Sequence, residues 1–150
     1  MCVIDRAPRG GAAPSYGAGP KTANDLKGLR VTVMGLGRFG GGVGVTRWLA
    51  GNGAKVLVTD LAAPGKLTAS LEKIRGLLET GAVEVRLGGH DVDDFRGCDL
   101  VVANPAVPRP WADPYLAAAG TAGVPITTEI ALLVERLDRG RVIGVTGTAG

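Results

Sequence analysis

The hexapeptide GLGRFG, Gly35 to Gly40, constrains the fold of this chain more than any other stretch. It begins where the β-branched run 29–35 ends and leads into a segment of helical character, which is the setting of a G-x-G-x-x-G turn. There Gly35 allows a tight bend, Gly37 lets backbone approach a phosphate, and Gly40 lets the helix pack on the strand. The first helical amides favour an anion. We therefore predict nucleotide binding; the alternative is that the glycines only make a tight turn.

Asp60 strengthens this prediction. It ends a second strand-like run, AKVLVTD (54–60), about twenty residues after the last glycine of the motif. A carboxylate at that place can accept hydrogen bonds from ribose hydroxyls or from the edge of a base. The motif does not specify which nucleotide is bound.

The rest of the chain alternates between strand-like and helix-like segments. Strands are predicted at 29–35, 54–60, 83–89, 100–103, 124–129 and 141–147, and helices at 38–50, 67–81, 113–120 and 130–137. Such alternation implies parallel strands joined by right-handed crossovers. We expect an α/β, Rossmann-like, doubly wound and mainly parallel sheet over residues 26–138, preceded by a disordered tail at 1–25. A start codon placed too far upstream would explain that tail equally well.

Two predicted helices have clear apolar positions, and the first of them also contains glycines that disfavour a helix. Val45, Trp48 and Leu49 lie on the expected buried side of the first helix, and Ile130, Leu133, Val134 and Leu137 form the apolar stripe of the last. The run GGGVG, Gly40 to Gly44, falls inside the first helix, where each glycine costs about 1 kcal/mol relative to alanine. Either the helix starts late or close packing there requires absent side chains.

Composition excludes several classes of protein. The chain has 150 residues, 45% of them hydrophobic, and a net charge of +3 with no block of Lys and Arg, which argues against nucleic-acid binding. No apolar run approaches the roughly 18 residues of a membrane span, and the first residues lack the apolar centre of a signal peptide. Cys2 and Cys98 are far apart, so free thiols in a reducing cytoplasm are expected.

ANPAVP, 103–108, follows the fourth predicted strand. Ligands of open parallel sheets lie outside the carboxyl ends of the strands. Asn104 offers both a donor and an acceptor there, and the prolines hold the loop rigid. A simple strand-ending turn is the alternative.

Five further side chains have two interpretations each. His90, the only histidine, could act as a base, although a solvated loop histidine is the plainer interpretation. Asp91, Asp93 and Asp94 could hold a cation, or they form a polar loop and the start of a helix. Glu129 either faces the ligand cleft or only begins the last helix. No metal site and no catalytic residue is predicted.

The chain ends in GVTGTAG, a strand-like run that leads into T-G-x-x-G. Successive amides of such a turn could form an anion nest. A phosphate-binding loop of this type continues with Lys and then Ser or Thr, which do not follow here. Residues 139–150 are therefore either the first strand and partial phosphate loop of a truncated ATPase domain or an ordinary glycine-rich end of a chain.

Taken in order, VMGLGRFG, VLVTD, DLVVANPAVP, ITTEIALL and RVIGVTGTAG resemble the amino-terminal part of a Mur ligase, over about residues 28–150. GLGRFG favours the D-glutamate-adding branch, because the alanine-adding branch usually reads G-I-G-G-x-G. The resemblance implies a first domain that holds the UDP part of UDP-N-acetylmuramoyl-L-alanine, followed by an ATPase domain and a third domain that recruits the amino acid. ATP then phosphorylates the substrate carboxylate and D-glutamate attacks the acyl phosphate, assisted by Mg²⁺ and a carbamylated lysine.

The resemblance also carries site residues by position. The glycines of the turn with Arg38 and Phe39 would lie at the diphosphate, and Asp60 beside uracil or ribose. Near the nucleotide would lie Asn104, Pro105 and Ala106; the ATP loop would begin with Thr146, Gly147, Thr148, Ala149 and Gly150.

The sequence departs from the family pattern at several of these positions. Phe39 stands where Ser or Thr is common, Asn104 to Ala106 where Ser-Pro-Gly is usual, and Ala149 where Asn is frequent; Leu61 and Ala62 stand where a basic residue often follows Asp60. We expect a monomeric fragment that binds a uridine nucleotide weakly and catalyses nothing alone. The alternatives are an NAD(P)-binding Rossmann domain of a dehydrogenase or ligand sensor, and a scaffold with no ligand.

Overall fold

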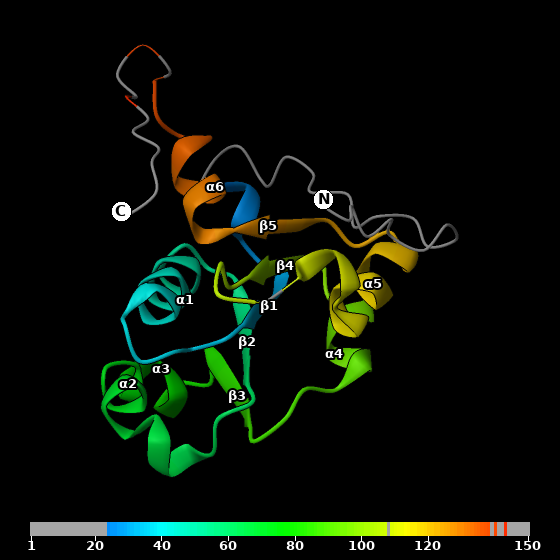
Figure 1. Cartoon of the computed structure of the whole chain (residues 1–150). Coiled ribbons are helices and arrows are strands. Elements are labelled where there is room, and N and C mark those ends of the chain that lie inside the picture. Colours follow the sequence, from blue (N-terminus) through cyan, green and yellow to red (C-terminus); the bar gives the residue numbers. More distant parts are fainter. Residues whose placement is uncertain (1–23, 108, 139, 141–142, 144–150) are drawn as a thin grey trace, which may run out of the picture.

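The computed structural model describes residues 24–107, 109–138, 140 and 143. A five-stranded sheet with spatial order β3-β2-β1-β4-β5 lies at its centre (Figure 1). The strands are β1 (Arg30–Met34), β2 (Lys55–Asp60), β3 (Val83–Leu87), β4 (Leu100–Ala103) and β5 (Ile126–Thr128). All four neighbouring pairs are parallel. The predicted α/β Rossmann-like sheet is confirmed.

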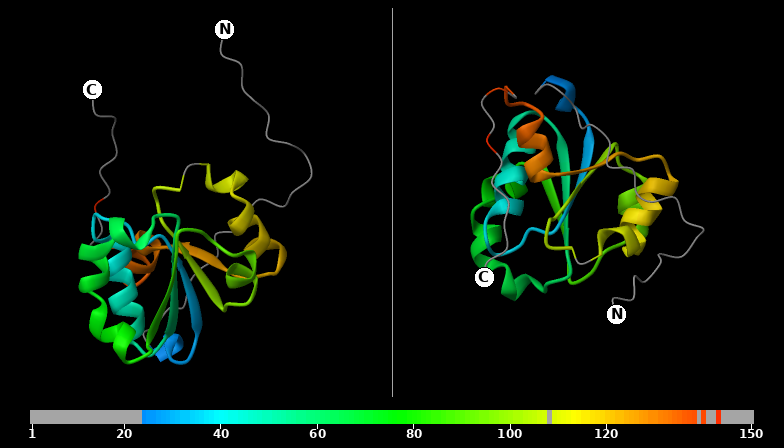
Figure 2. Two further views of the ribbon diagram at one scale, coloured as in Figure 1. Left: turned by 90° about the horizontal axis from the view of Figure 1, so that it is seen from below. Right: turned by 45° about the horizontal axis from the view of Figure 1, so that its top comes forward.

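Helices cover both faces of the sheet, as Figure 2 shows. The helices are α1 (Gly41–Gly51), α2 (Thr68–Glu72), α3 (Arg75–Glu79), α4 (Val92–Arg96), α5 (Pro114–Thr121) and α6 (Glu129–Val134), with short 3-10 turns η1 (Asn24–Leu26), η2 (Pro64–Lys66) and η3 (Pro110–Ala112). α1, α2, α3 and α6 lie on one face, whereas α4 and α5 lie on the other. Within the described residues no helix is long and apolar enough to cross a membrane.

The sheet divides the core into two layers, because successive side chains of a strand point to opposite faces. Val31 and Val33 of β1 pack in the layer beneath α1, whereas Met34 packs with Phe95 and Leu116 beneath α4 and α5. Burial on both faces is the reason that the central strands are continuously apolar.

Side-chain caps fix where α4, α5 and α6 begin. The Asp113 carboxylate accepts hydrogen bonds from the amides of Tyr115 and Leu116, both at 3.0 Å, and so starts α5 as the sequence predicts. Asp91 caps α4 in the same way, through the amide of Asp93 at 3.0 Å. This confirms the interpretation of the acidic run as a loop and helix start.

Three helix predictions are wrong in their bounds, and one of them is the last helix, predicted over 130–137, which is α6 at Glu129–Val134. The helix predicted over 67–81 is two short helices, α2 and α3, that part at Lys73 and Ile74. Ile74 is buried at the break, and Gly76 just after it is a poor helix former. The first helix begins at Gly41, because Gly40 takes a left-handed conformation with φ of 99°.

The predictions for the two ends of the chain stay predictions. The expected tail falls almost wholly in residues 1–23, and the partial phosphate loop falls in 144–150; both segments lie outside the described residues. The proposed division at about 138–139 is likewise untested.

Candidate nucleotide-binding site

The turn 35–40 lies at the topological switch point of the sheet. From β1 the chain continues to β2 on one side, whereas from β4 it continues to β5 on the other side, so the connections after these two paired strands diverge at their carboxyl ends, where ligands of such sheets bind. Asp60 ends the neighbouring β2, and Asn104 follows β4. Parallel strands therefore bring all three predicted elements of the site to one edge.

A hollow of about 620 Å³ opens at this edge. Its lining includes nearly every residue predicted to contact UDP: Gly37, Arg38, Phe39, Gly40, Asp60, Asn104, Pro105 and Ala106. Gly35 lies directly behind Asn104. Phe39 does not close the hollow, because its side chain is 98% exposed. Lys66 also lines the hollow, and no sequence signal had indicated it.

Asp60 anchors the glycine turn. Its Oδ2 accepts a hydrogen bond from the Gly37 amide at 3.0 Å, and its Oδ1 accepts one from the Ala62 amide at 2.8 Å. The Gly37 amide is thus directed at the carboxylate and not at an incoming phosphate. A carboxylate has lone pairs for further bonds, so the predicted contact of Asp60 with ribose or base stays a prediction.

Ser70 of α2 holds the same turn from its other side. Its Oγ donates to the carbonyl oxygen of Gly37 at 2.7 Å, and the residue is only 4% exposed. Gly37 is therefore fixed through both its amide and its carbonyl group. Sequence reasoning missed Ser70, because nothing local marks a serine that bonds to a turn 33 residues away.

The amides that remain for an anion are those beyond Gly37. The backbone N–H groups of Arg38, Phe39 and Gly40 donate to no group in the described part of the chain, and the first amides of α1 have no intrahelical partner. These groups lie next to each other at the positive end of the α1 dipole, which favours a phosphate.

Close packing explains the glycine run at the start of α1. A Cβ on Gly42 would lie 2.3 Å from the carbonyl oxygens of Gly35 and Leu36, so the helix approaches the turn only because that side chain is absent. Nothing lies within 4 Å of a Cβ on Gly40, so space does not demand a glycine there. Glycine is required at this position for its positive φ instead. The packing role predicted for Gly40 therefore belongs to Gly42.

Gly35 must be glycine for both reasons: its backbone takes a positive φ, and a side chain there would have no space. Its φ is 96°, and a Cβ there would lie 2.8 Å from Nδ2 of Asn104. Asn104 in turn accepts a hydrogen bond from the Ala106 amide through Oδ1, at 2.8 Å. The amide side chain of Asn104 therefore braces the turn after β4 against the turn after β1.

Glu129 lies between this hollow and a second one. It is the first residue of α6, and a Cβ on Gly41 would meet its two carboxylate oxygens at 2.5 Å. The carboxylate therefore lies against the amino-terminal end of α1, where negative charge is favoured. Glu129 begins α6 and also lines the hollow, so the interpretation that it only begins the helix is wrong.

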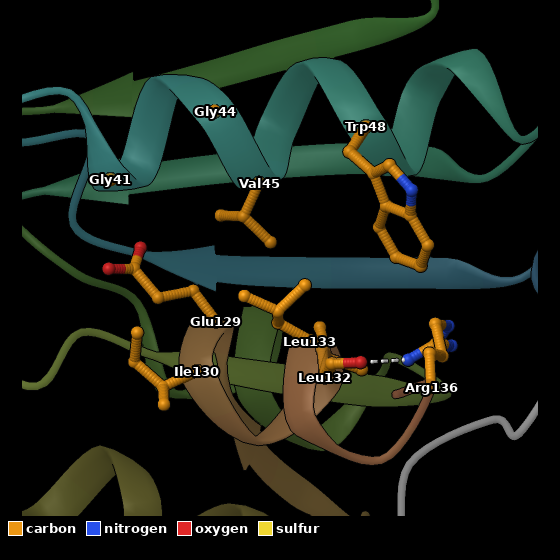
Figure 3. A pocket seen from close by; sticks show the side chains of 9 residues that line it. All are labelled: Gly41, Gly44, Val45, Trp48, Glu129, Ile130, Leu132, Leu133 and Arg136. Carbon is orange, nitrogen blue, oxygen red and sulfur yellow. Dashed lines mark hydrogen bonds between the residues drawn. The ribbon is translucent and has the colours of Figure 1, made fainter. Parts of the chain in front are cut away.

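The second hollow is a groove of about 300 Å³ between α1 and α6 (Figure 3). Val45, Trp48, Ile130 and Leu133 give it apolar walls. The guanidinium carbon of Arg136 lies 4.6 Å from the centre of the Trp48 ring, a cation–π arrangement. The amides without a partner at the glycine turn lie in the first hollow, so the first hollow and not this groove is the candidate site.

His90 is not a solvated loop histidine. It is half-buried, and its ring lies edge-on to Tyr115 and Phe95, with centroid distances of 5.0 and 5.8 Å. Burial lowers the pKa of His90, although the carboxylates of Asp113 and Asp60 act in the opposite direction. The neutral imidazole is therefore favoured.

The acidic run beside His90 has structural partners. Arg86 of β3 binds the Asp94 carboxylate, with Nε 2.5 Å from Oδ2, and Asp91 caps α4. Among the described residues, no group of three or more His, Cys, Asp or Glu side chains could hold a metal ion. Cys98 is a buried free thiol, and Cys2 lies outside the described residues.

Comparison with known proteins identifies relatives of most of the chain. The family described as Mur ligase MurD-like, N-terminal domain, matches residues 29–128. The UDP-N-acetylmuramoylalanine–D-glutamate ligase of Roseiflexus sp. (strain RS-1) is 48% identical over 125 residues, covering 83% of this chain and 25% of that protein. The enzyme of the same name from Anaeromyxobacter dehalogenans (strain 2CP-C) is 43% identical over 128 residues, covering 85% and 26%. The chain thus spans about a quarter of the length of these curated relatives.

Solved structures support the fold independently. Quinate dehydrogenase from Corynebacterium glutamicum in complex with NAD superimposes with a TM-score of 0.51 at 20% sequence identity, covering 73% of this chain and 47% of that chain. At this identity the likeness shows the Rossmann-like fold alone.

Proposed function

This chain belongs to the family of MurD-like N-terminal domains of Mur ligases, and from that premise we propose that it binds the uridine diphosphate part of UDP-N-acetylmuramoyl-L-alanine. One observation carries the proposal. The unpaired amides of the glycine turn, the start of α1 and the side chains of Arg38 and Lys66 line one hollow at the switch point of the sheet. Anions bind where such amides and cations converge.

The turn is suited to this task because it is held before any ligand arrives. Asp60 and Ser70 fix both polar groups of Gly37, so the amides of Arg38 to Gly40 need no rearrangement to meet a diphosphate. Binding to a preorganised site avoids the entropy loss of ordering a loop. Backbone amides also compensate for Phe39, which lacks the hydroxyl that the family commonly has there.

In a full-length protein we propose that this binding serves an ATP-dependent, ADP-forming ligase, which adds D-glutamate to the bound substrate in cytoplasmic peptidoglycan synthesis. The names of the relatives support this proposal, although the chain covers only 25% and 26% of their lengths. ATP and Mg²⁺ would be held by residues that include Thr146 to Gly150, which lie outside the described residues. The described residues bind the nucleotide of the substrate and so position its distant carboxylate. We further propose that the fragment is monomeric and inactive alone.

The dehydrogenase alternative has no specific observation in its favour. The likeness to an NAD-bound dehydrogenase concerns the fold, at 20% identity. The family match, by contrast, covers most of the described chain. We therefore keep NAD only as a competitor ligand in the test.

Isothermal titration of the 150-residue chain with UDP-N-acetylmuramoyl-L-alanine, UDP and NAD tests the proposal. We expect both uridine compounds to bind and NAD to bind at least tenfold more weakly. Arg38→Ala weakens UDP binding, whereas Arg47→Ala, an exposed arginine of α1 outside the hollow, leaves it unchanged. Equal binding of NAD and UDP, or no binding of any uridine compound, would contradict the proposal.

A further inference from the structure

The groove between α1 and α6 is an apolar surface that the described part of the chain leaves open. Val45 and Trp48 of α1 form one wall, and Ile130 and Leu133 of α6 form the other (Figure 3). Ile130 and Leu133 are each 56% exposed. Large apolar side chains that gather on a surface in this way mark a place where another segment or molecule packs. The groove therefore has the character of a docking site.

The two ends of the groove carry opposite charges. Glu129 lies at one end, against the start of α1, and Arg136 lies at the other, over the Trp48 ring. The stretch of α1 from Gly41 to Trp48 is about 10 Å long at the rise of an α-helix. An extended segment of about three or four residues fills this length. The groove thus suits a short apolar segment with an acid next to Arg136.

Residues 2–5, with the sequence CVID, have this composition. Val3 and Ile4 are the only valine and isoleucine side chains in residues 1–23, and Asp5 is the only acid there. The segment after α6 is the other apolar stretch of this chain that begins near the groove. Its residue Ile143 is 91% exposed, so that segment does not fill the groove. Composition and exposure therefore both favour residues 2–5.

The chain can reach the groove from where its described part begins. The Gly28 amide donates to the Gly53 carbonyl oxygen at 2.8 Å, just beyond the end of α1, so the described chain begins near the Trp48 end of the groove. Residues 6–23 connect Asp5 to this point. A glycine-rich connection of that length spans roughly 24 Å on average, which exceeds the length of the groove. Its effective concentration at the groove is of millimolar order, so a weak contact is enough.

We propose that residues 2–5 of this chain dock in the groove between α1 and α6, with Val3 and Ile4 on its apolar walls and Asp5 at the guanidinium of Arg136. A guanidinium has five N–H donors, so Arg136 can accommodate a carboxylate while it stays over the Trp48 ring. The inference goes beyond the proposed function, because the docked segment needs no nucleotide. It also narrows the predicted disordered tail to the residues after Asp5.

A spin label on Cys2 tests the contact in the full chain. Cys98 is buried, so a thiol-reactive nitroxide attaches to Cys2 under native conditions. We expect it to broaden the amide NMR signals of Val45 and Leu133 more strongly than that of Ala118, which lies in α5 on the opposite face of the sheet. Equal broadening on both faces, or none on either, overturns the inference.

Variants of the segment provide the controls. Ile4→Asp places a charge in the apolar part of the groove and should abolish the selective broadening, whereas Ala12→Asp makes the same charge change in the connecting residues and should retain it. Asp5→Asn should lower the docked-to-free ratio by up to about fivefold. None of these substitutions replaces a residue of the sheet or its helices. An Ile4→Asp chain that behaves like the parent overturns the inference.

A mixed sample separates docking within one chain from contact between two copies. Spin-labelled chains are mixed with isotope-labelled chains that carry no nitroxide. We expect no selective broadening at Leu133 in this sample. Broadening there would mean that a second copy fills the groove, which overturns docking within the chain. The titration with UDP is independent of these measurements, so failure of the proposed function leaves this inference standing, and the reverse.

Discussion

The carboxylate of Asp60 accepts a hydrogen bond from the backbone amide of Gly37 at 3.0 Å, and so ties the end of β2 to the glycine turn after β1. The other carboxylate oxygen accepts from Ala62 at 2.8 Å. The acid that is proposed to contact the nucleoside thus also shapes the turn that is proposed to bind the diphosphate. Loss of Asp60 therefore affects the fold of the turn as well as any direct contact.

Asp60→Ala should reduce both stability and binding. Two amides lose a charged acceptor, and we expect the free energy of unfolding to fall by about 1–3 kcal/mol. Asp60→Asn retains one acceptor oxygen, so its stability and its affinity for UDP should lie between those of the parent chain and those of Asp60→Ala. Urea denaturation followed by circular dichroism measures the stability, and titration with UDP measures the binding. A stable Asp60→Ala chain that binds UDP normally would show that the turn needs no anchor.

Ser70→Ala should weaken the turn from the opposite side. The Gly37 carbonyl loses its 2.7 Å partner in a place with little access to water, so we expect a loss of about 1–2 kcal/mol. UDP affinity should fall as well, because Ser70 acts only through the turn. Thr80→Ala is the matched control: its hydroxyl bonds a carbonyl oxygen on the exposed end of α3, and its removal should change stability by less than about 0.5 kcal/mol.

The contrast between Asp60 and Ser70 shows how far the sequence can predict this site. Asp60 follows from a spacing, because the end of a second parallel strand always lies beside the turn after the first. The hydrogen bond from Ser70 to Gly37 depends on how α2 packs over that turn. The sequence could not predict it, because the helix predicted over 67–81 did not have the right bounds. His90 likewise needed the structure, since a loop residue gives no periodicity from which burial can be inferred.

Alanine at two glycines of α1 should have opposite effects. Gly42→Ala forces a methyl group against the carbonyl oxygens of Gly35 and Leu36, and we expect a loss of about 1–3 kcal/mol together with weaker UDP binding. Gly44→Ala meets open space inside the same helix, and should stabilise the chain by about 0.5–1 kcal/mol. Thermal melts of both variants measure the difference. Equal effects would mean that α1 does not approach the turn as described.

The stability of the chain should fall in mildly acidic solution because of His90. Burial lowers the pKa of His90 in the folded chain, so the unfolded chain takes up a proton first as the pH falls. The contribution of neutral His90 is complete above its unfolded pKa of about 6.5 and is lost as the pH falls toward the folded value. Unfolding free energies between pH 5 and 8 measure this slope.

His90→Gln provides the control for that slope, because the chain has no other histidine. The variant should show a flatter profile over the same range. Hydrogen bonds from Arg30 lower the pKa of Asp99, so that carboxylate protonates only at more acidic pH and does not contribute here. An identical slope in parent and variant would contradict the burial of His90.

The last helix shows a limit of reasoning from periodicity, and it provides the final prediction. Ile130, Leu133, Val134 and Leu137 have helical spacing, yet Leu133 is 56% exposed, whereas Leu132 is 2% exposed and packs in the core beneath α1. The pattern identifies a helix, but its rotation depends on the neighbouring α1 and β5.

Leu132→Ala should therefore lower the free energy of unfolding by about 2–5 kcal/mol, because it leaves a cavity in that core. Leu133→Ala, one residue further along the same helix, should change it by less than about 1 kcal/mol, since most of its side chain already faces water in the groove of Figure 3. Urea denaturation of the two variants measures these losses of stability. A larger loss for Leu133→Ala would mean that α6 is rotated to bury the stripe predicted from the sequence.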